Sequence, residues 1–520
     1  MDSAARRGPP SVQRRRGWAA ALLPLVLVVA TAEVKPPMRT ASRTPETYLG
    51  TRARQLLGLR GGGFKGCKAL KGRWMARASQ RGDVKDLREC SGGASPATSV
   101  FNLVNNVAGA GLLTLSAGMA GGVGSVPATA IASVLGFLSW FTFTVLGGCC
   151  SALNVADFRG LWCLTIGKDS AWVIDLSIFF MCFSACVIYS GIIRDILTSL
   201  AITVGIPSSL NFRSLNLVLL TCLVLVPLCL MRSLAALGMT SFLGFAAVAY
   251  TMLFTVFRAL DGSYSPASGK FLAGLAQEQA PSFLQTSRWG LSPRVFVLTA
   301  NLGLAFIAHY NAPRYFAELR GHSPRRFTRM SATAFGILTL LYITMMLAGN
   351  ALFGDNAQSN ILSNFATTDM LAVGGRVATG VSIIFGYPLA FCGLFDALQG
   401  TAASLAEHAG TLRWLCNWVS APPTTWHEDL LRLTLLSGAT ATALAVRDIG
   451  VVVGLTGSLI GATIVYIVPS MVALRTRQSC SPDDLRKSLG SLYQPVAFYC
   501  LIGFGLVVGG IGALETLRSA

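Results

Sequence analysis

The hydrophobic residues of this chain are gathered into long, nearly uncharged runs that alternate with short polar connections. Most runs approach the roughly 20 residues that a helix needs to cross about 30 Å of hydrocarbon. Backbone polar groups in lipid must be paired within their own segment, so the runs are predicted to be helices. The pattern predicts an all-α, polytopic membrane protein with about 11 transmembrane helices, near Ser99–Leu115, Val126–Gly148, Ala171–Ile193, Leu215–Met231, Leu237–Phe257, Val295–His309, Ser331–Leu352, Leu371–Leu394, Leu433–Val446, Val451–Val472 and Val496–Ala513.

Composition and charge agree with a lipid environment. Of the 520 residues, 52% are hydrophobic and only 12% are charged, which is outside the range of soluble globular domains. The formal net charge of +19 is concentrated in residues 1–90, which hold 19 Lys and Arg against 6 Asp and Glu. This basic tail lacks the pattern of basic residues interleaved with aromatic residues on a folded surface that is typical of nucleic-acid binding, so we expect no nucleic-acid partner. Targeting or contact with anionic lipid explains the tail better.

The residues before the first predicted span are typical of targeting segments. Three arginines precede an apolar stretch, Trp18–Ala30, which ends in the small-residue pattern Ala30-Thr31-Ala32. We therefore interpret residues 1–32 as a signal-peptide-like leader, with a retained signal anchor as the alternative. Residues 33–97 are basic and are predicted to be disordered or transit-like. Together, the two segments resemble the two-part leader of proteins delivered to complex plastids. The membrane in which the protein resides is therefore left open among the plasma membrane, the vacuole or endomembrane, and the plastid envelope.

The first predicted span carries the most unusual polar residues of the membrane region. Asn102, Asn105 and Asn106 precede the sequence Gly109-Ala110-Gly111. Carboxamides inside a membrane helix are costly without partners, and glycine allows a helix to unwind. An unwound segment would free carbonyl groups for a cation and N–H groups for a carboxylate. The alternative is that the two glycines form a close helix-packing contact.

Five motifs follow one another along the chain. They are the first span, the Leu237–Ser241 start of the fifth, Phe306–Leu319 with its His309, Pro313 and Tyr315, Phe353–Asn356 followed by Ser359–Leu362, and Asp448–Gly461. In this order they resemble the amino acid/auxin permease superfamily, especially its sodium-coupled neutral amino-acid transporter branch. The similarity covers residues 98–516, which we interpret as the transporter domain.

The resemblance implies two inverted five-helix repeats, a LeuT-like fold in which helices 1 and 6 are broken around the substrate. The small-residue run Gly303–Ala308 would be the break in helix 6. The residues expected to bind substrate are Gly109, Ala110, Gly111, Ala305 and Phe306.

The resemblance also implies a coupling ion, and no other cofactor or metal is expected. Asn105 matches the asparagine that lines the sodium site in sodium-coupled relatives. Those relatives carry a hydroxyl residue shortly before the helix 8 proline, whereas the nearest hydroxyl here is Ser382, on a different helix face. Proton coupling is therefore the alternative to sodium. His309 is a candidate for a proton or pH role, although a hydrogen-bonded structural histidine fits the same position.

The predicted function is secondary active transport of an amino acid by symport with a proton or sodium ion. Aliphatic and aromatic neighbours such as Leu112, Phe306 and Ile307 suggest a neutral substrate. No catalytic motif is found, so we do not expect an enzyme. The competing hypothesis is an amino-acid sensor or receptor that uses the same binding site without net transport.

Overall fold

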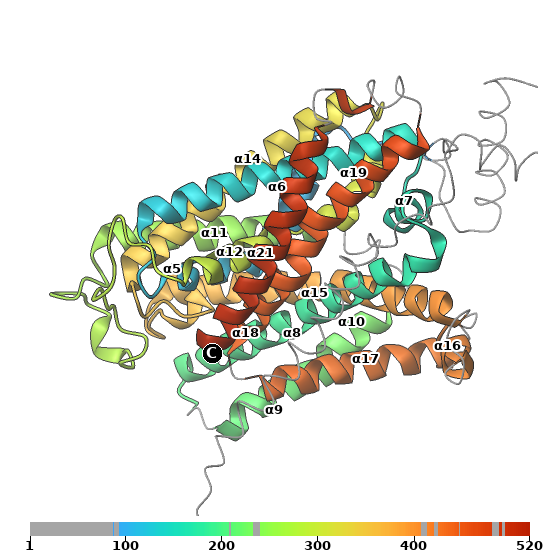
Figure 1. Ribbon diagram of the computed structural model, residues 1–520. Helices are drawn as coiled ribbons and strands as arrows, with labels where there is room; N and C mark the ends of the chain where they lie inside the picture. The colour runs from blue at the N-terminus through green and yellow to red at the C-terminus, as the bar shows by residue number, and fades with distance from the viewer. Residues whose placement is uncertain are drawn as a thin grey trace, which may run out of the picture.

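The computed structural model describes Leu87 and residues 93–519, except 207–209, 232–239, 407–412, 421–424, 447, 481–487 and 491–493. The predicted leader 1–32 and most of the basic segment 33–97 lie outside the described residues. Long helices packed in one bundle make up most of the described chain (Figure 1). The helices are α4 (Pro96–Val107), α5 (Gly111–Met119), α6 (Ser125–Leu153), α7 (Phe158–Thr165), α8 (Ala171–Thr203), α9 (Leu210–Leu220), α10 (Val226–Leu230), α11 (Thr240–Asp261), α12 (Val295–Ala305), α13 (Ala312–Glu318), α14 (Pro324–Phe353), α15 (Met370–Ala406), α16 (Arg413–Val419), α17 (Thr425–Ala445), α18 (Ile449–Leu455), α19 (Val468–Ser479) and α21 (Pro495–Ser519).

The apolar runs of the sequence coincide with these helices. Among the described residues, 8 helices are long and apolar enough to cross a membrane, and α4 with α5 forms a bent pair that makes a ninth. The two other predicted spans also contain helices. One is a shorter apolar helix, Ser214–Leu230, and the other is α17, with 21 residues. The all-α, polytopic membrane fold is therefore confirmed, while the count of about 11 spans stays a prediction.

Helix ends follow from local side-chain chemistry. Ser95 accepts a hydrogen bond from the Thr98 amide at 3.1 Å and so caps the start of α4, next to a proline in the first turn. Asp448 caps α18 in the same way, through the Gly450 amide at 2.9 Å. At the other end of a helix, Asn154 adopts the left-handed conformation, with φ of 61°, and terminates α6. Side-chain caps and left-handed C-terminal residues satisfy backbone groups that the helix itself leaves free.

The packing places α12 at the centre of the bundle. It contacts α5, α6, α18 and α21, while α6 lies along α14 and α8 lies along α15 (Figure 1). Next to α12 the chain after α18 forms two π-helical turns, Thr456–Gly461 and Thr463–Ile467. A Cβ atom at Gly303 of α12 would lie 3.2 Å from the Gly457 carbonyl oxygen, so this glycine allows close backbone contact between the two elements.

A buried ion pair joins the end of α11 to the start of α15. The Arg258 Nε and Nη2 atoms donate to the two Asp369 carboxylate oxygens at 2.9 and 2.6 Å. The Tyr264 hydroxyl also donates to Asp369, at 3.0 Å, and the Asp369 side chain is 0% exposed. A two-point arginine–carboxylate contact fixes the relative orientation of the two helices.

Candidate functional site

The first span is interrupted where the sequence predicted. Helix α4 ends at Val107 and α5 begins at Gly111, and the two helices are bent by 57° at the break. Neither Gly109 nor Gly111 has a positive φ angle, so the bend does not depend on left-handed glycine geometry. Before the break, Asn105 is partly buried, whereas Asn102 and Asn106 are exposed. Of the three asparagines, Asn105 is therefore the one whose side chain turns towards the protein interior.

The sixth span is interrupted as well. Helix α12 ends at Ala305, a 3-10 turn covers His309–Asn311, and α13 begins at Ala312. Residues 306–308 connect the helix to the turn, within the run Gly303–Ala308 where the resemblance implied a break. The prediction that helices 1 and 6 are discontinuous is therefore confirmed, whereas the inverted repeats implied by the resemblance stay a prediction.

The two breaks lie directly against each other. A Cβ atom added to Gly111 would lie 3.0 Å from the Ala305 Cα atom and 3.2 Å from its Cβ atom. Gly111 therefore serves close packing, the alternative that the sequence left open, and it does so at a real helix break. Tyr342 of α14 completes the junction, because its hydroxyl lies 3.0 Å from the Val107 carbonyl oxygen and 2.7 Å from that of Ala305.

The other predicted substrate residues surround this junction. Ala110, Ala305 and Phe306 are only 7%, 3% and 0% exposed. Gly109 is less tightly enclosed, since a Cβ atom there would meet only the Tyr189 hydroxyl of α8, at 3.5 Å. A side chain at position 109 would thus make only an ordinary contact, unlike one at position 111.

Asn105 and Ser382 converge on one point of a third helix. A Cβ atom at Gly244 of α11 would lie 2.9 Å from Asn105 Oδ1 and 3.2 Å from Ser382 Oγ. The structure therefore brings together oxygen atoms from α4 and α15, two helices far apart in the sequence. Side-chain oxygens of this kind are ligands for hard cations, and a Cβ atom at position 244 would crowd both of them.

His309 lies in a closed, aromatic environment. Its side chain is 0% exposed, with the rings of Phe143 and Phe335 centred 5.7 and 6.3 Å away. The Nε2 atom lies 2.9 Å from Thr142 Oγ1 and 3.1 Å from the Ser139 carbonyl oxygen, both on α6. A carbonyl oxygen only accepts, so this nitrogen carries the proton and joins the α12–α13 connection to α6.

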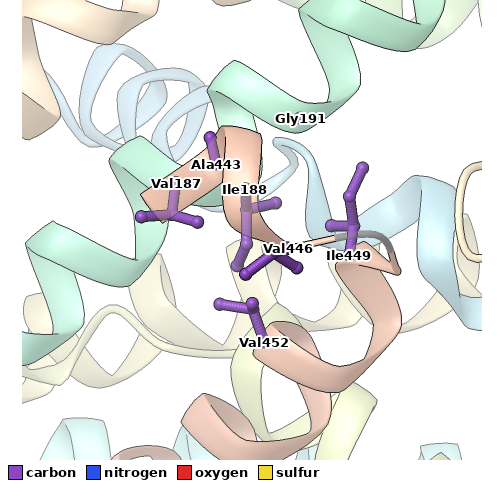
Figure 2. Close-up of a pocket in the computed structure, with 7 residues that line it drawn as sticks. All are labelled: Val187, Ile188, Gly191, Ala443, Val446, Ile449 and Val452. Atoms are coloured by element: carbon purple, nitrogen blue, oxygen red, sulfur yellow. The ribbon is translucent and has the colours of Figure 1, made fainter. Parts of the chain in front are cut away.

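Two pockets lie elsewhere in the bundle. The first, between α8, α17 and α18, has no room for a water molecule, and its side chains are all aliphatic (Figure 2). It offers no group that could bind a zwitterion. The second, of about 140 Å³, lies at the end of the bundle where the chain after α14 meets α18. Its lining contains both signs of charge, from Arg294, Asp355 and Asp448.

Sequence reasoning missed Gly244, Tyr189 and Tyr342. Gly244 and Tyr189 gave no local signal, because no residue pattern near either position predicts a contact with the first helix. Tyr342 gave a weak one, since a tyrosine within an apolar span requires a hydrogen-bond partner for its hydroxyl. Only the packed structure shows that this partner is the pair of helix ends.

The model of the family described as transmembrane amino acid transporter protein matches residues 92–515. The vacuolar amino acid transporter 5 of Schizosaccharomyces pombe is 28% identical over 299 residues, which are 56% of this chain and 66% of that protein. The putative sodium-coupled neutral amino acid transporter 11 of Danio rerio is 25% identical, over 76% of this chain and 83% of that protein. A solved structure, the inward facing conformation of Mhp1, aligns with a TM-score of 0.45 at 13% identity, over 84% of this chain and 92% of that chain.

Proposed function

The chain belongs to the transmembrane amino acid transporter family, and we propose that it carries a neutral amino acid across a bilayer together with a sodium ion. The observation that carries the proposal is the direct contact between two interrupted helices, at Gly111 and Ala305. Discontinuous helices that meet within a membrane bundle are the elements from which transporters build their substrate and ion sites.

The backbone at the breaks supplies what a zwitterion needs. The N-terminal end of α5 carries a partial positive charge that favours a carboxylate, whereas the C-terminal ends of α4 and α12 favour an ammonium group. Helices α4, α5 and α12 contain no Asp, Glu, Lys or Arg. A charged substrate side chain would therefore find no partner on them, which supports a neutral amino acid.

The convergence of Asn105 and Ser382 supports sodium as the coupling ion. Both side chains present oxygen at Gly244, from two helices that are far apart in the sequence, and oxygen is the ligand atom that a hard cation prefers. A proton would instead need a titratable group that exchanges with water. His309 is fully buried and is hydrogen-bonded to α6, so it supports the proton alternative less well.

The second pocket supports an approach route for the same substrate. It adjoins α5 and α12 beyond their contact at the breaks, and it combines Arg294 with Asp355 and Asp448. A zwitterion can be paired at both of its charged groups there before it reaches the helix breaks.

The test is uptake by the purified chain in proteoliposomes. Labelled neutral amino acids are supplied under an imposed sodium gradient and, separately, under a proton gradient. We expect accumulation driven by sodium, and its loss in both Asn105→Ala and Ser382→Ala. Asn102→Ala is the matched control, because its exposed side chain lies on the same helix outside the candidate site.

Three other outcomes would each change one part of the proposed function. Accumulation that follows only the proton gradient would replace sodium by a proton. Binding of amino acids without accumulation would favour the sensor. Normal sodium-driven uptake in Asn105→Ala would remove the cation site from this position.

A further inference from the structure

The phenol of Tyr342 lies where the ends of two interrupted helices meet. We propose that Tyr342 is a positioning residue whose hydroxyl takes the place of a cation between the C-terminal ends of α4 and α12. It thereby holds the two helix breaks at a fixed separation without a bound ion. The inference rests on the proposed function, because the breaks are its candidate substrate site.

The hydrogen-bond geometry gives the first argument. The hydroxyl lies 2.7 Å from the Ala305 carbonyl oxygen and 3.0 Å from that of Val107. A phenol has a single proton, so it can satisfy only one of these acceptors at a time. The Val107 oxygen also accepts from the Gly109 amide, at 2.8 Å. The Tyr342 hydroxyl therefore donates its proton to the Ala305 carbonyl oxygen, which is the nearer of the two.

The electrostatics of helix ends give the second argument. Val107 is the last residue of α4 and Ala305 is the last residue of α12, so each carbonyl oxygen belongs to a helix end with partial negative charge. Two such ends facing one point attract a cation, and interrupted transporter helices often hold one in this arrangement. Here a neutral O–H group supplies the positive end of a dipole instead. The junction then needs no ion of its own, and Asn105 with Ser382 marks the coupling site.

The packing of the ring separates this role from simple core filling. Tyr342 is 0% exposed, and its ring centroid is 4.9 Å from that of Phe306. Helix α14 also packs against both α4 and α5. A phenylalanine keeps these ring contacts and removes only the oxygen, so Tyr342→Phe should fold and insert normally.

The first experiment measures thermal unfolding of the full chain in detergent, as sodium chloride replaces an organic-cation chloride at constant ionic strength. All variants carry Asn105→Ala, so that the proposed coupling site does not contribute. Without the hydroxyl, two carbonyl oxygens face each other with space for a small ion. We expect sodium to raise the midpoint temperature of unfolding of the Tyr342→Phe variant. The parent that retains Tyr342 should show no such rise.

Tyr466→Phe is the matched control. Its hydroxyl is similarly buried but makes no hydrogen bond to a helix-end carbonyl oxygen among the described residues, so its loss should create no sodium response. A sodium response in this control, or none in Tyr342→Phe, would overturn the proposal. The unfolding experiment tests whether the Tyr342 hydroxyl takes the place of a cation, even if the wild-type chain proves to transport nothing.

Uptake gives the second readout, in an otherwise wild-type chain. We expect Tyr342→Phe to lower kcat roughly tenfold, as for a lost buried hydrogen bond, while the KM for the amino acid changes less. A positioning role predicts this separation, because the backbone groups that bind substrate are still present but are held less rigidly. Unchanged kcat in Tyr342→Phe would contradict it.

Discussion

Gly111 packs against Ala305 so closely that a side chain at position 111 would begin 3.0 Å from the Ala305 Cα atom. The neighbouring atom belongs to the backbone at the end of α12, so it cannot move aside as a flexible side chain would. The contact joins the two helix breaks, and it makes the size of residue 111 a direct test of the site.

Substitutions at the two glycines of the first break should therefore differ. Gly111→Ala should lower sodium-driven uptake about tenfold or more, and Gly111→Val should abolish it, because overpacking of this kind costs roughly 1–3 kcal/mol and displaces the break. Gly109→Ala is the control, since its Cβ atom would meet only the Tyr189 hydroxyl at an ordinary 3.5 Å. Equal losses in the two alanine variants would show that glycine flexibility matters here rather than packing.

Gly244→Ala should block the cation site without removing any of its oxygen atoms. The added methyl group would lie 2.9 Å from Asn105 Oδ1 and 3.2 Å from Ser382 Oγ, in the space assigned to sodium. We expect the apparent sodium affinity in uptake assays to fall about tenfold or more, which corresponds to about 1.4 kcal/mol. Gly386→Ala lies on the same helix as Ser382 and meets nothing within 4 Å, so it should leave sodium affinity unchanged. If Gly244→Ala also leaves it unchanged, the ion binds elsewhere.

His309→Gln should retain uptake with an unaltered pH profile between about pH 5 and 8, the range in which an exchangeable histidine would titrate. The glutamine amide can still donate to the Ser139 carbonyl oxygen, which His309 contacts at 3.1 Å. His309→Ala cannot donate, and it should lower the free energy of unfolding by about 1–3 kcal/mol. The measurement is the initial uptake rate at a fixed sodium gradient, with His322→Gln, in the connection between α13 and α14, as control. Loss of pH dependence in His309→Gln alone would restore the proton role.

Asp369→Asn should destabilise the chain and weaken sodium binding together. Breaking a buried ion pair costs about 3–5 kcal/mol, and this pair holds α11, which carries Gly244, against α15, which carries Ser382. Thermal unfolding in detergent and sodium affinity in uptake should both report the change. Glu318→Gln is the control, because its pair with Arg314 is exposed and joined by a contact at 2.7 Å, and exposed pairs contribute about 0–1 kcal/mol. Comparable effects of the two substitutions would show that the Arg258–Asp369 contact does not orient the helices.

Local signals in the sequence were enough to predict the helices and the first interruption. Apolar runs predict spans because lipid leaves the backbone no other hydrogen-bond partners. The break at 108–110 was predicted from the glycines of Gly109-Ala110-Gly111, which allow a helix to unwind. The break at 306–308 was instead implied by the family resemblance, in which helices 1 and 6 are equivalent.

The partners of each side chain were decided only by the tertiary structure. From the sequence, Ser382 lay on a different helix face from the hydroxyl found in sodium-coupled relatives. In the bundle, however, it approaches the same point of Gly244 as Asn105. Likewise, no periodicity could show that Tyr342 reaches the ends of both interrupted helices. Side-chain direction within one helix follows from its 3.6-residue repeat, but meeting another helix depends on how the two cross, which is set by packing over the whole bundle.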